Sequence, residues 1–306
     1  MRFGVYPGGP AGGEGAELTV GPPDDPERIQ TVLADLSVPL VRCYTGFWDP
    51  PGRDWDTPAD PLRYATDGRG LDLVLQYQSA SGDVAGFVEF VRERVRALGP
   101  YAATIQVCEE PNLDRPQLDG SSPRVREALT RALPAARAEA DALGLDVRVG
   151  FNVVPAAPDD DFFADLARLG GAEFAAAVDY VALDCFPDVF FPIPGERIAD
   201  AVGGLIDGLR RRSLPAAGLD PGIELRIGEH GWPTGPERDE RTQADRIETV
   251  VRTAAKHGIT GYTLFSLRDS DSTVADLYHQ FGIMRSDYTP KIAYGRFKEL
   301  VAEIST

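Results

Sequence analysis

Apolar and amphipathic segments alternate along the whole chain of 306 residues, and this alternation is the strongest constraint on the fold. The apolar segments are short and rich in β-branched residues, which predicts buried strands. They lie at Phe3–Tyr6, Pro39–Tyr44, Leu71–Gln78, Thr104–Glu109, Val147–Val154, Val178–Phe186, Glu224–Gly228 and Gly261–Leu267. The amphipathic segments predict helices at Pro26–Leu36, Asp83–Leu98, Pro123–Leu143, Asp160–Leu169, Glu196–Arg212, Glu240–His257 and Lys291–Ile304.

The order of these segments predicts a single (β/α)8 barrel, or TIM barrel, of the α/β class that spans residues 1–306. No charged linker or change of composition divides the chain into domains. A doubly wound open sheet is the alternative, and it is disfavoured because no GxGxxG motif follows the first strand. The crossover Asp49–Gly70 has the weakest helical pattern, since it is dense in Pro, Asp and Gly.

The charge of the chain limits the partners that it can bind. A net charge of -17 argues against nucleic acid and anionic membranes, because both repel a polyanion. No apolar run is long enough to span a membrane, and no basic-then-apolar leader is visible. The sequence gives no indication of the oligomeric state.

Three cysteines, Cys43, Cys108 and Cys185, form no CxxC pair. We expect them to be small core side chains in a protein of the reducing cytoplasm. No cluster of His, Cys and Asp has the spacing of metal ligands, so we expect neither a metal nor a cofactor.

Carboxylates stand at the ends of two predicted strands that are far apart in sequence. Glu109 and Glu110 end the fourth strand, and Glu229 follows the seventh. In a barrel of this type, the functional side chains lie at the C-terminal ends of the strands. A pair of such carboxylates is what acid–base chemistry on a glycosidic bond requires. Other strand ends carry Arg268 and Asp269, which complete a polar ring.

These motifs, taken in order, resemble those of the retaining (β/α)8 glycoside hydrolases of clan A, whose catalytic carboxylates follow strands four and seven. Glu109-Glu110-Pro111 matches the acid/base motif Asn-Glu-Pro, and Glu229-His230-Gly231-Trp232-Pro233 matches the nucleophile motif. Arg42 matches a strand-two arginine that contacts the nucleophile, and Phe281–Tyr294 is similar to the closing segment of many such enzymes. The resemblance implies that Glu110 is the acid/base, that Glu229 is the nucleophile, and that the substrate is a carbohydrate or small glycoside.

The chain departs from the family pattern at three supporting positions. Glu109 replaces an Asn that donates to the sugar 2-hydroxyl, and an ionised Glu cannot donate. Asp184-Cys185-Phe186 stands where the family often has a Tyr, and Phe265 or Leu267 where it has a Trp beneath the sugar. One hypothesis is that Glu109 selects a cationic or amino-bearing sugar. The alternative is that its side chain turns outward or joins a salt bridge.

We expect a set of strand-end side chains to bind the substrate. Its members are Arg42, Tyr44, Gln78, Glu109, Asn152, Asp184, His230, Trp232 and Phe265. Trp48 and Trp55 are candidates for additional stacking. For Arg42 the alternative is a plain buried ion pair, and for Trp232 it is a lid over the core.

The sequence therefore favours a retaining glycosidase acting on a glycosidic bond that we expect to be β. The alternative is an altered barrel of the same type that binds carbohydrate without turnover, which the three replaced positions would explain. An isomerase or aldolase is disfavoured, because no lysine stands at a predicted strand end.

Overall fold

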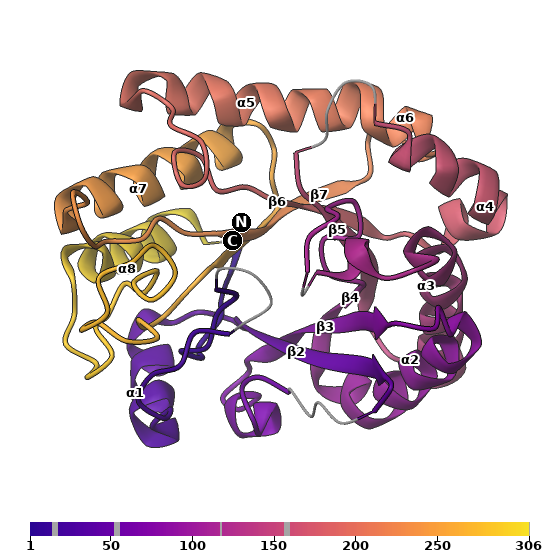
Figure 1. Cartoon of the computed structure of the whole chain (residues 1–306), viewed down its shortest axis with the longest axis horizontal. Helices are drawn as coiled ribbons and strands as arrows, with labels where there is room; N and C mark the ends of the chain where they lie inside the picture. The colour runs from indigo at the N-terminus through magenta and orange to yellow at the C-terminus, as the bar shows by residue number, and fades with distance from the viewer. Residues whose placement is uncertain (14–17, 52–55, 117, 156–159, 306) are drawn as a thin grey trace.

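The computed structural model describes residues 1–13, 18–51, 56–116, 118–155 and 160–305. Their strands are parallel and close into a barrel in sequence order, with β8 paired to β1 (Figure 1). The strands are β1 (Arg2–Val5), β2 (Leu40–Asp49), β3 (Gly70–Ser79), β4 (Ala102–Val107), β5 (Arg148–Val153), β6 (Tyr180–Asp184), β7 (Glu224–His230) and β8 (Gly261–Leu264). The predicted (β/α)8 barrel is confirmed.

Helices surround this barrel, as Figure 1 shows. They are α1 (Pro26–Leu36), α2 (Val84–Leu98), α3 (Val125–Ala142), α4 (Phe162–Ala177), α5 (Ile198–Gly208), α6 (Leu214–Ala216), α7 (Glu240–Lys256) and α8 (Ile292–Ile304). Asp25, Asp83 and Asp239 fix the starts of α1, α2 and α7, since each side chain accepts a backbone N–H of the first turn. In the described part of the weak crossover, the helical element is the short 3-10 turn Pro61–Tyr64. None of the helices described is long and apolar enough to cross a membrane.

Several predicted boundaries are wrong. The fourth helix was expected to end at Leu169, whereas α4 continues to Ala177 across a kink at Gly171, which has a φ of 54°. The seventh strand was expected to end at Gly228, whereas β7 continues to His230. The register with β6 shifts there, because Leu183 pairs with Ile227 and Asp184 pairs with Glu229. Gly228 is therefore the extra residue of a β-bulge.

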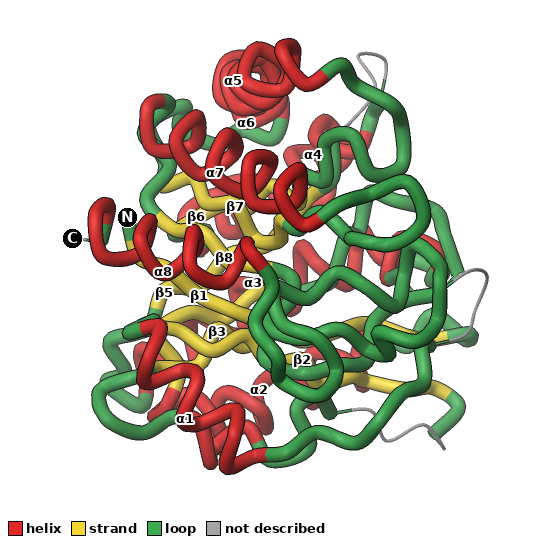
Figure 2. Tube along the Cα trace, turned by 90° about the vertical axis from the view of Figure 1, so that its left-hand side faces the viewer, coloured by secondary structure: helices red, strands yellow, loops and turns green. Residues whose placement is uncertain are grey.

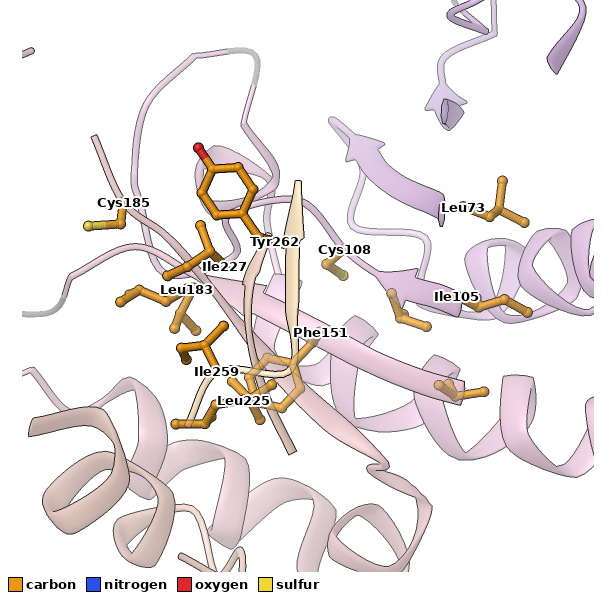
Figure 3. Close-up of a cluster of buried hydrophobic side chains, with 14 of the residues drawn as sticks. Leu73, Ile105, Cys108, Phe151, Leu183, Cys185, Leu225, Ile227, Ile259 and Tyr262 are labelled. Carbon is orange, nitrogen blue, oxygen red and sulfur yellow. The ribbon is translucent and has the colours of Figure 1, made fainter. Parts of the chain in front are cut away.

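The apolar core lies between the barrel and its helices. Figure 3 shows side chains of this layer, including Leu73, Ile105, Phe151, Leu183 and Ile227, all of them buried. Cys43, Cys108 and Cys185 are free thiols within this core, as predicted.

The interior of the barrel is polar. Arg42, Asp72, Thr104, Gln106 and Thr263 are buried there and hydrogen-bonded to one another. In Figure 2 the loops gather on the right, opposite the chain termini, and this is the end toward which the strands run.

Candidate active site

The floor of the site is built around Arg42, whose guanidinium is buried in the barrel. It donates from Nη1 to Asp72 Oδ2 at 3.0 Å and from Nη2 to Gln106 Oε1 at 3.1 Å. Asp72 in turn accepts the hydroxyls of Thr104, at 2.7 Å, and Thr263, at 3.2 Å. These bonds fix Arg42 in place, so that its remaining N–H groups point to the mouth of the barrel.

Glu229 is held by two donors that come from β2. Arg42 Nε lies 3.1 Å from Glu229 Oε1, and the Tyr44 hydroxyl donates to the same oxygen. The bulge at Gly228 accounts for this orientation, since it inserts one extra residue between Ile227, which lies in the apolar core, and Glu229, which contacts Arg42 in the interior. Both donors therefore orient the same oxygen of Glu229. The expected contact of Arg42 with Glu229 is present, and the Tyr44 hydroxyl on β2 is a second donor.

Loss of the Tyr44 hydroxyl is expected to weaken the site more than the fold. Tyr44→Phe removes one of the two donors to Glu229 while the ring stays in place, and kcat/KM should fall about 10²-fold. The matched control is Tyr180→Phe, because the Tyr180 hydroxyl is buried in the barrel with no partner among the described residues. Equal kcat/KM values for the two variants on an aryl glycoside would contradict a role for Tyr44.

Glu110 has a different environment from Glu229. Its backbone is left-handed, with a φ of 45°, and its N–H donates to Asn152 Oδ1 at 2.9 Å. Its carboxyl group has no hydrogen-bond partner within the described chain and lines a cavity that Glu229 also lines. Burial raises the pKa of Glu110 well above its usual range, and the charges of Glu109 and Glu229 raise it further. This is the environment of a carboxylic acid that keeps its proton.

Glu109 turns into the barrel and joins a salt bridge, which is the second of the two interpretations of this residue. Its Oε2 accepts Arg42 Nη2 at 3.3 Å and Gln106 Nε2 at 2.7 Å, and its Oε1 lies 3.3 Å from Asn152 Nδ2. Burial and the charge of Glu229 raise the pKa of Glu109, although Arg42 opposes them. Because both oxygens already have donors, the idea that Glu109 selects an amino-bearing sugar loses its support.

Asp184 adds a further carboxylate to the cavity. Its Oδ2 accepts Asn152 Nδ2 at 2.5 Å, and burial raises its pKa, as does the charge of Glu229. Glu109, Glu110 and Asp184 each bring one oxygen within 4.8 Å of the others, which is close enough for a shared cation. Two of the three already accept hydrogen bonds from neighbouring side chains. The expected absence of a metal therefore stays a prediction.

Asp119 holds the loop that carries Glu109 and Glu110, and sequence reasoning missed it. It is buried, and its carboxyl accepts the backbone N–H groups of Tyr77 and Glu109, both at 2.7 Å. Its other oxygen accepts Gln78 Nε2 at 2.8 Å. Burial raises the pKa of Asp119 to about 7. Gln78, which was expected to bind substrate, is not among the described lining residues of the cavity and donates to the carboxyl that supports the loop.

Removing the Asp119 carboxyl is expected to destabilise the fold. Asp119→Ala leaves two buried backbone N–H groups without an acceptor, which costs about 2–4 kcal/mol of the free energy of unfolding. Denaturant unfolding measures this loss. Asp114→Ala, an exposed carboxyl in the same loop, is the matched control and should change stability by less than about 0.5 kcal/mol. Similar losses for both variants would refute the bracing role.

Two expected substrate ligands lie outside the cavity. His230 follows Glu229 but points into the layer between barrel and helices, where its Nδ1 lies 2.6 Å from the Tyr262 hydroxyl. Burial lowers the pKa of His230 to about 3, so that it stays neutral. Trp232 packs with Val189 and Phe281 behind the wall of the cavity. Strand alternation and the bulge account for the direction of the His230 side chain, because Glu229 and His230 are consecutive residues that face opposite sides of β7.

Other residues named from the sequence have mixed outcomes. Phe265 lines the cavity and stacks on Tyr6, with ring centroids 5.2 Å apart. Arg268 is buried against Asp24 of the N-terminal loop, with Nη2 and Oδ1 2.6 Å apart, so it does not belong to the site. Asp269 pairs with Lys291 at 2.7 Å and thereby anchors the start of α8. Trp55 lies outside the described residues.

The cavity over these carboxylates has a volume of about 560 Å³. Glu110, Asp184 and Glu229 stand in its lining, and the loops after β4, β6 and β8 form its walls. Two of these groups have opposite electrostatic environments: Glu229 accepts two donors, and Glu110 accepts none from the described residues. The arrangement is suited to proton transfer beside a nucleophilic carboxylate.

No protein-family model and no curated protein matches the sequence. Among solved structures, a family 39 glycoside hydrolase from Bacteroides cellulosilyticus WH2 is similar, with a TM-score of 0.69 and 16% identity over 99% of this chain and 63% of that one. A family 1 β-glucosidase from Thermotoga maritima has a TM-score of 0.65 and 13% identity, over 90% and 85% of the two chains. The chain shares the (β/α)8 barrel fold of these two proteins.

The match in barrel fold extends to a protein of similar length. A fungal β-1,4-galactanase aligns with a TM-score of 0.63 and 12% identity, over 98% of this chain and 99% of that one. By contrast, the chain spans 63% of the family 39 enzyme and 47% of a β-galacturonidase from Eisenbergiella tayi. What these proteins share with the present chain is the barrel fold.

Proposed function

We propose that the protein is a retaining glycoside hydrolase that cleaves a β-glycosidic bond, with Glu229 as nucleophile and Glu110 as acid/base. The observation that carries this proposal is the contrast between two carboxyl groups of one cavity. Glu229 accepts hydrogen bonds from Arg42 and Tyr44, whereas Glu110 accepts none from the described residues, and burial and neighbouring charges raise the pKa of Glu110. Double displacement needs this division, because one group attacks while the other gives up a proton.

The reaction then proceeds in two steps. Glu229 attacks the anomeric carbon, the glycosidic C–O bond breaks, and the leaving oxygen takes the proton of Glu110. A covalent glycosyl ester on Glu229 results. A water molecule then gives a proton to Glu110 and attacks the anomeric carbon, which releases Glu229 and leaves the sugar with its original configuration.

A second candidate is a barrel that binds carbohydrate without turning it over. The observation that favours it is Glu109, a buried acceptor in the position where the resemblance leads us to expect an amide that donates to the sugar 2-hydroxyl. Without that donor the transition state loses a hydrogen bond. Sugar binding without cleavage across a panel of aryl β-glycosides would favour this candidate.

Covalent trapping tests the first proposal. We expect a 2-deoxy-2-fluoro glycoside with a good leaving group to inactivate the protein, and peptide mapping by mass spectrometry to place the adduct on Glu229. Glu173→Gln, an exposed carboxylate on α4, is the control and should be trapped at the wild-type rate. An adduct on another residue, or release of an α-configured product, would refute the mechanism.

A further inference from the structure

The walls of the cavity above the carboxylates are mainly apolar. The loop after β6 contributes Phe186, Phe190 and Phe191, and α5 contributes Leu205. Leu118 and Phe281 continue the apolar lining on the sides of β4 and β8. Phe190 and Phe191 are 44% and 80% exposed, so an apolar surface at the rim faces the solvent. Such a surface is costly to leave open and usually marks a binding site.

The charged and phenolic side chains of the wall are already engaged. Arg115 Nη2 donates to the Tyr278 hydroxyl at 3.0 Å. Asp188 accepts the backbone N–H of Ile193 at 3.1 Å and Arg246 Nε at 3.4 Å. Within the described lining, the carboxyl groups that face the cavity stand at its floor, where the reaction takes place. The part of the wall that the structure describes therefore offers few hydrogen bonds to a second sugar.

A sugar and an apolar group fit this wall very differently. Each hydroxyl of a second sugar ring would lose water without gaining a partner, which opposes binding. An alkyl chain or aromatic ring binds more tightly when it is buried there, with an affinity that rises roughly four-fold for each buried CH2 group. A volume of about 560 Å³ also exceeds the needs of a single sugar ring and lies in the range of sites for drug-sized ligands.

We propose that the leaving group of the substrate is apolar, so that the protein acts on alkyl or aryl glycosides rather than on oligosaccharides. This inference rests on the proposed glycosidase function, because the sugar must sit over Glu110 and Glu229. The leaving group then lies against Phe186, Phe190 and Leu205. The continuity of the apolar wall with the carboxylate floor in one cavity carries the assignment.

Matched substrates test it. Methyl and octyl β-glycosides of the same sugar have leaving groups of similar acidity, so that the chemistry is held constant while the apolar length changes. A panel of glucosides, galactosides, mannosides, xylosides and glucuronides identifies the sugar that is cleaved. For that sugar, kcat/KM of the octyl glycoside should be about 10²-fold higher than kcat/KM of the methyl glycoside. It should also exceed kcat/KM of the disaccharide with the same cleaved sugar. Equal rates for octyl and methyl glycosides, or preference for the disaccharide, would overturn the proposal.

Substitutions in the apolar wall test whether this wall causes the preference for octyl glycosides. Phe190→Ser and Leu205→Ser should each reduce the octyl-to-methyl ratio of kcat/KM about ten-fold. The control is Leu143→Ser at the end of α3, which is 47% exposed and does not line the cavity. A ratio unchanged in both wall variants, or lowered equally in the control, counts against the assigned wall.

Failure of the enzyme proposal gives a distinct result. If no glycoside of any sugar is cleaved, the proposed function is refuted. Calorimetry on the wild-type protein then tests whether the cavity wall binds an apolar group. Octyl glycosides should bind at least ten-fold more tightly than methyl glycosides, with the difference lost in Leu205→Ser. Equal binding of the two would overturn the inference as well.

Discussion

Replacing Glu229 with Gln is expected to lower kcat/KM by on the order of 10⁵-fold, the scale of losing a catalytic nucleophile. Gln has nearly the same shape and can still accept from Arg42 and Tyr44 through its amide oxygen, so the site stays assembled. What disappears is the oxygen that forms the glycosyl ester. Initial rates on a dinitrophenyl glycoside measure the loss, with Glu173→Gln as the variant that should keep wild-type activity.

The same substitution is expected to leave the fold as stable or more stable. The charge of Glu229 raises the pKa values of Glu109, Glu110 and Asp184, which means that it disfavours their ionised forms in the folded protein. Gln removes that repulsion while Arg42 keeps Asp72 and Glu109 as partners. Calorimetry at pH 7 should show an unchanged or higher Tm. A Tm lowered by more than about 5 °C would indicate that Glu229 serves the fold instead.

The fold follows from the sequence because its signals are local. Apolar strands and amphipathic helices each show their own periodicity, and their alternation leaves few ways to arrange a parallel sheet. The boundaries are harder, since they depend on contacts between elements. The bulge at Gly228 is set by the pairing of β7 with β6, and no pattern within Glu224–His230 predicts it.

The site residues also divide into those that the sequence predicts and those whose roles depend on contacts between elements. Glu110 and Glu229 are predictable because strand ends of a barrel converge on one mouth. The directions of His230 and Glu109 are not, because strand alternation leaves two faces open until the register is known. Asp119 stands ten residues beyond Glu109, and its role depends on backbone N–H groups that carry no sequence signal.

Loss of the Glu110 carboxyl is expected to affect the two steps of the reaction unequally. Glu110→Ala should lower kcat/KM by about 10³-fold for an alkyl glycoside, whose leaving oxygen needs a proton, and far less for a dinitrophenyl glycoside. Hydrolysis of the glycosyl ester still needs a base, so kcat and KM for the dinitrophenyl substrate should fall together. Azide should restore turnover and give a β-glycosyl azide. Equal losses on both substrates, without azide rescue, would refute the acid/base role.

The pH dependence of the wild-type protein follows from the same residue. Glu110 must be protonated for the first step, and its pKa is raised, so activity is lost as pH rises through a value above the usual range of a Glu. The profile of kcat/KM for an alkyl glycoside should therefore extend its plateau above pH 5 before it falls. In Glu110→Ala this alkaline limb should be absent from the dinitrophenyl profile. A limb that persists in the variant would assign the titration to another group.

The glycosyl ester should itself change the protonation of Glu110. Formation of the ester removes the negative charge of Glu229, one of the causes that raise the pKa of Glu110. The pKa of Glu110 then falls at the moment when the second step requires a base, which makes one residue suited to both roles. Carbon-13 NMR of labelled Glu side chains, compared between the free protein and the fluoroglycoside adduct, measures this change. Because burial and Glu109 remain, the pKa should drop without reaching that of an exposed Glu, and an unchanged value would show that Glu229 and Glu110 are not electrostatically coupled.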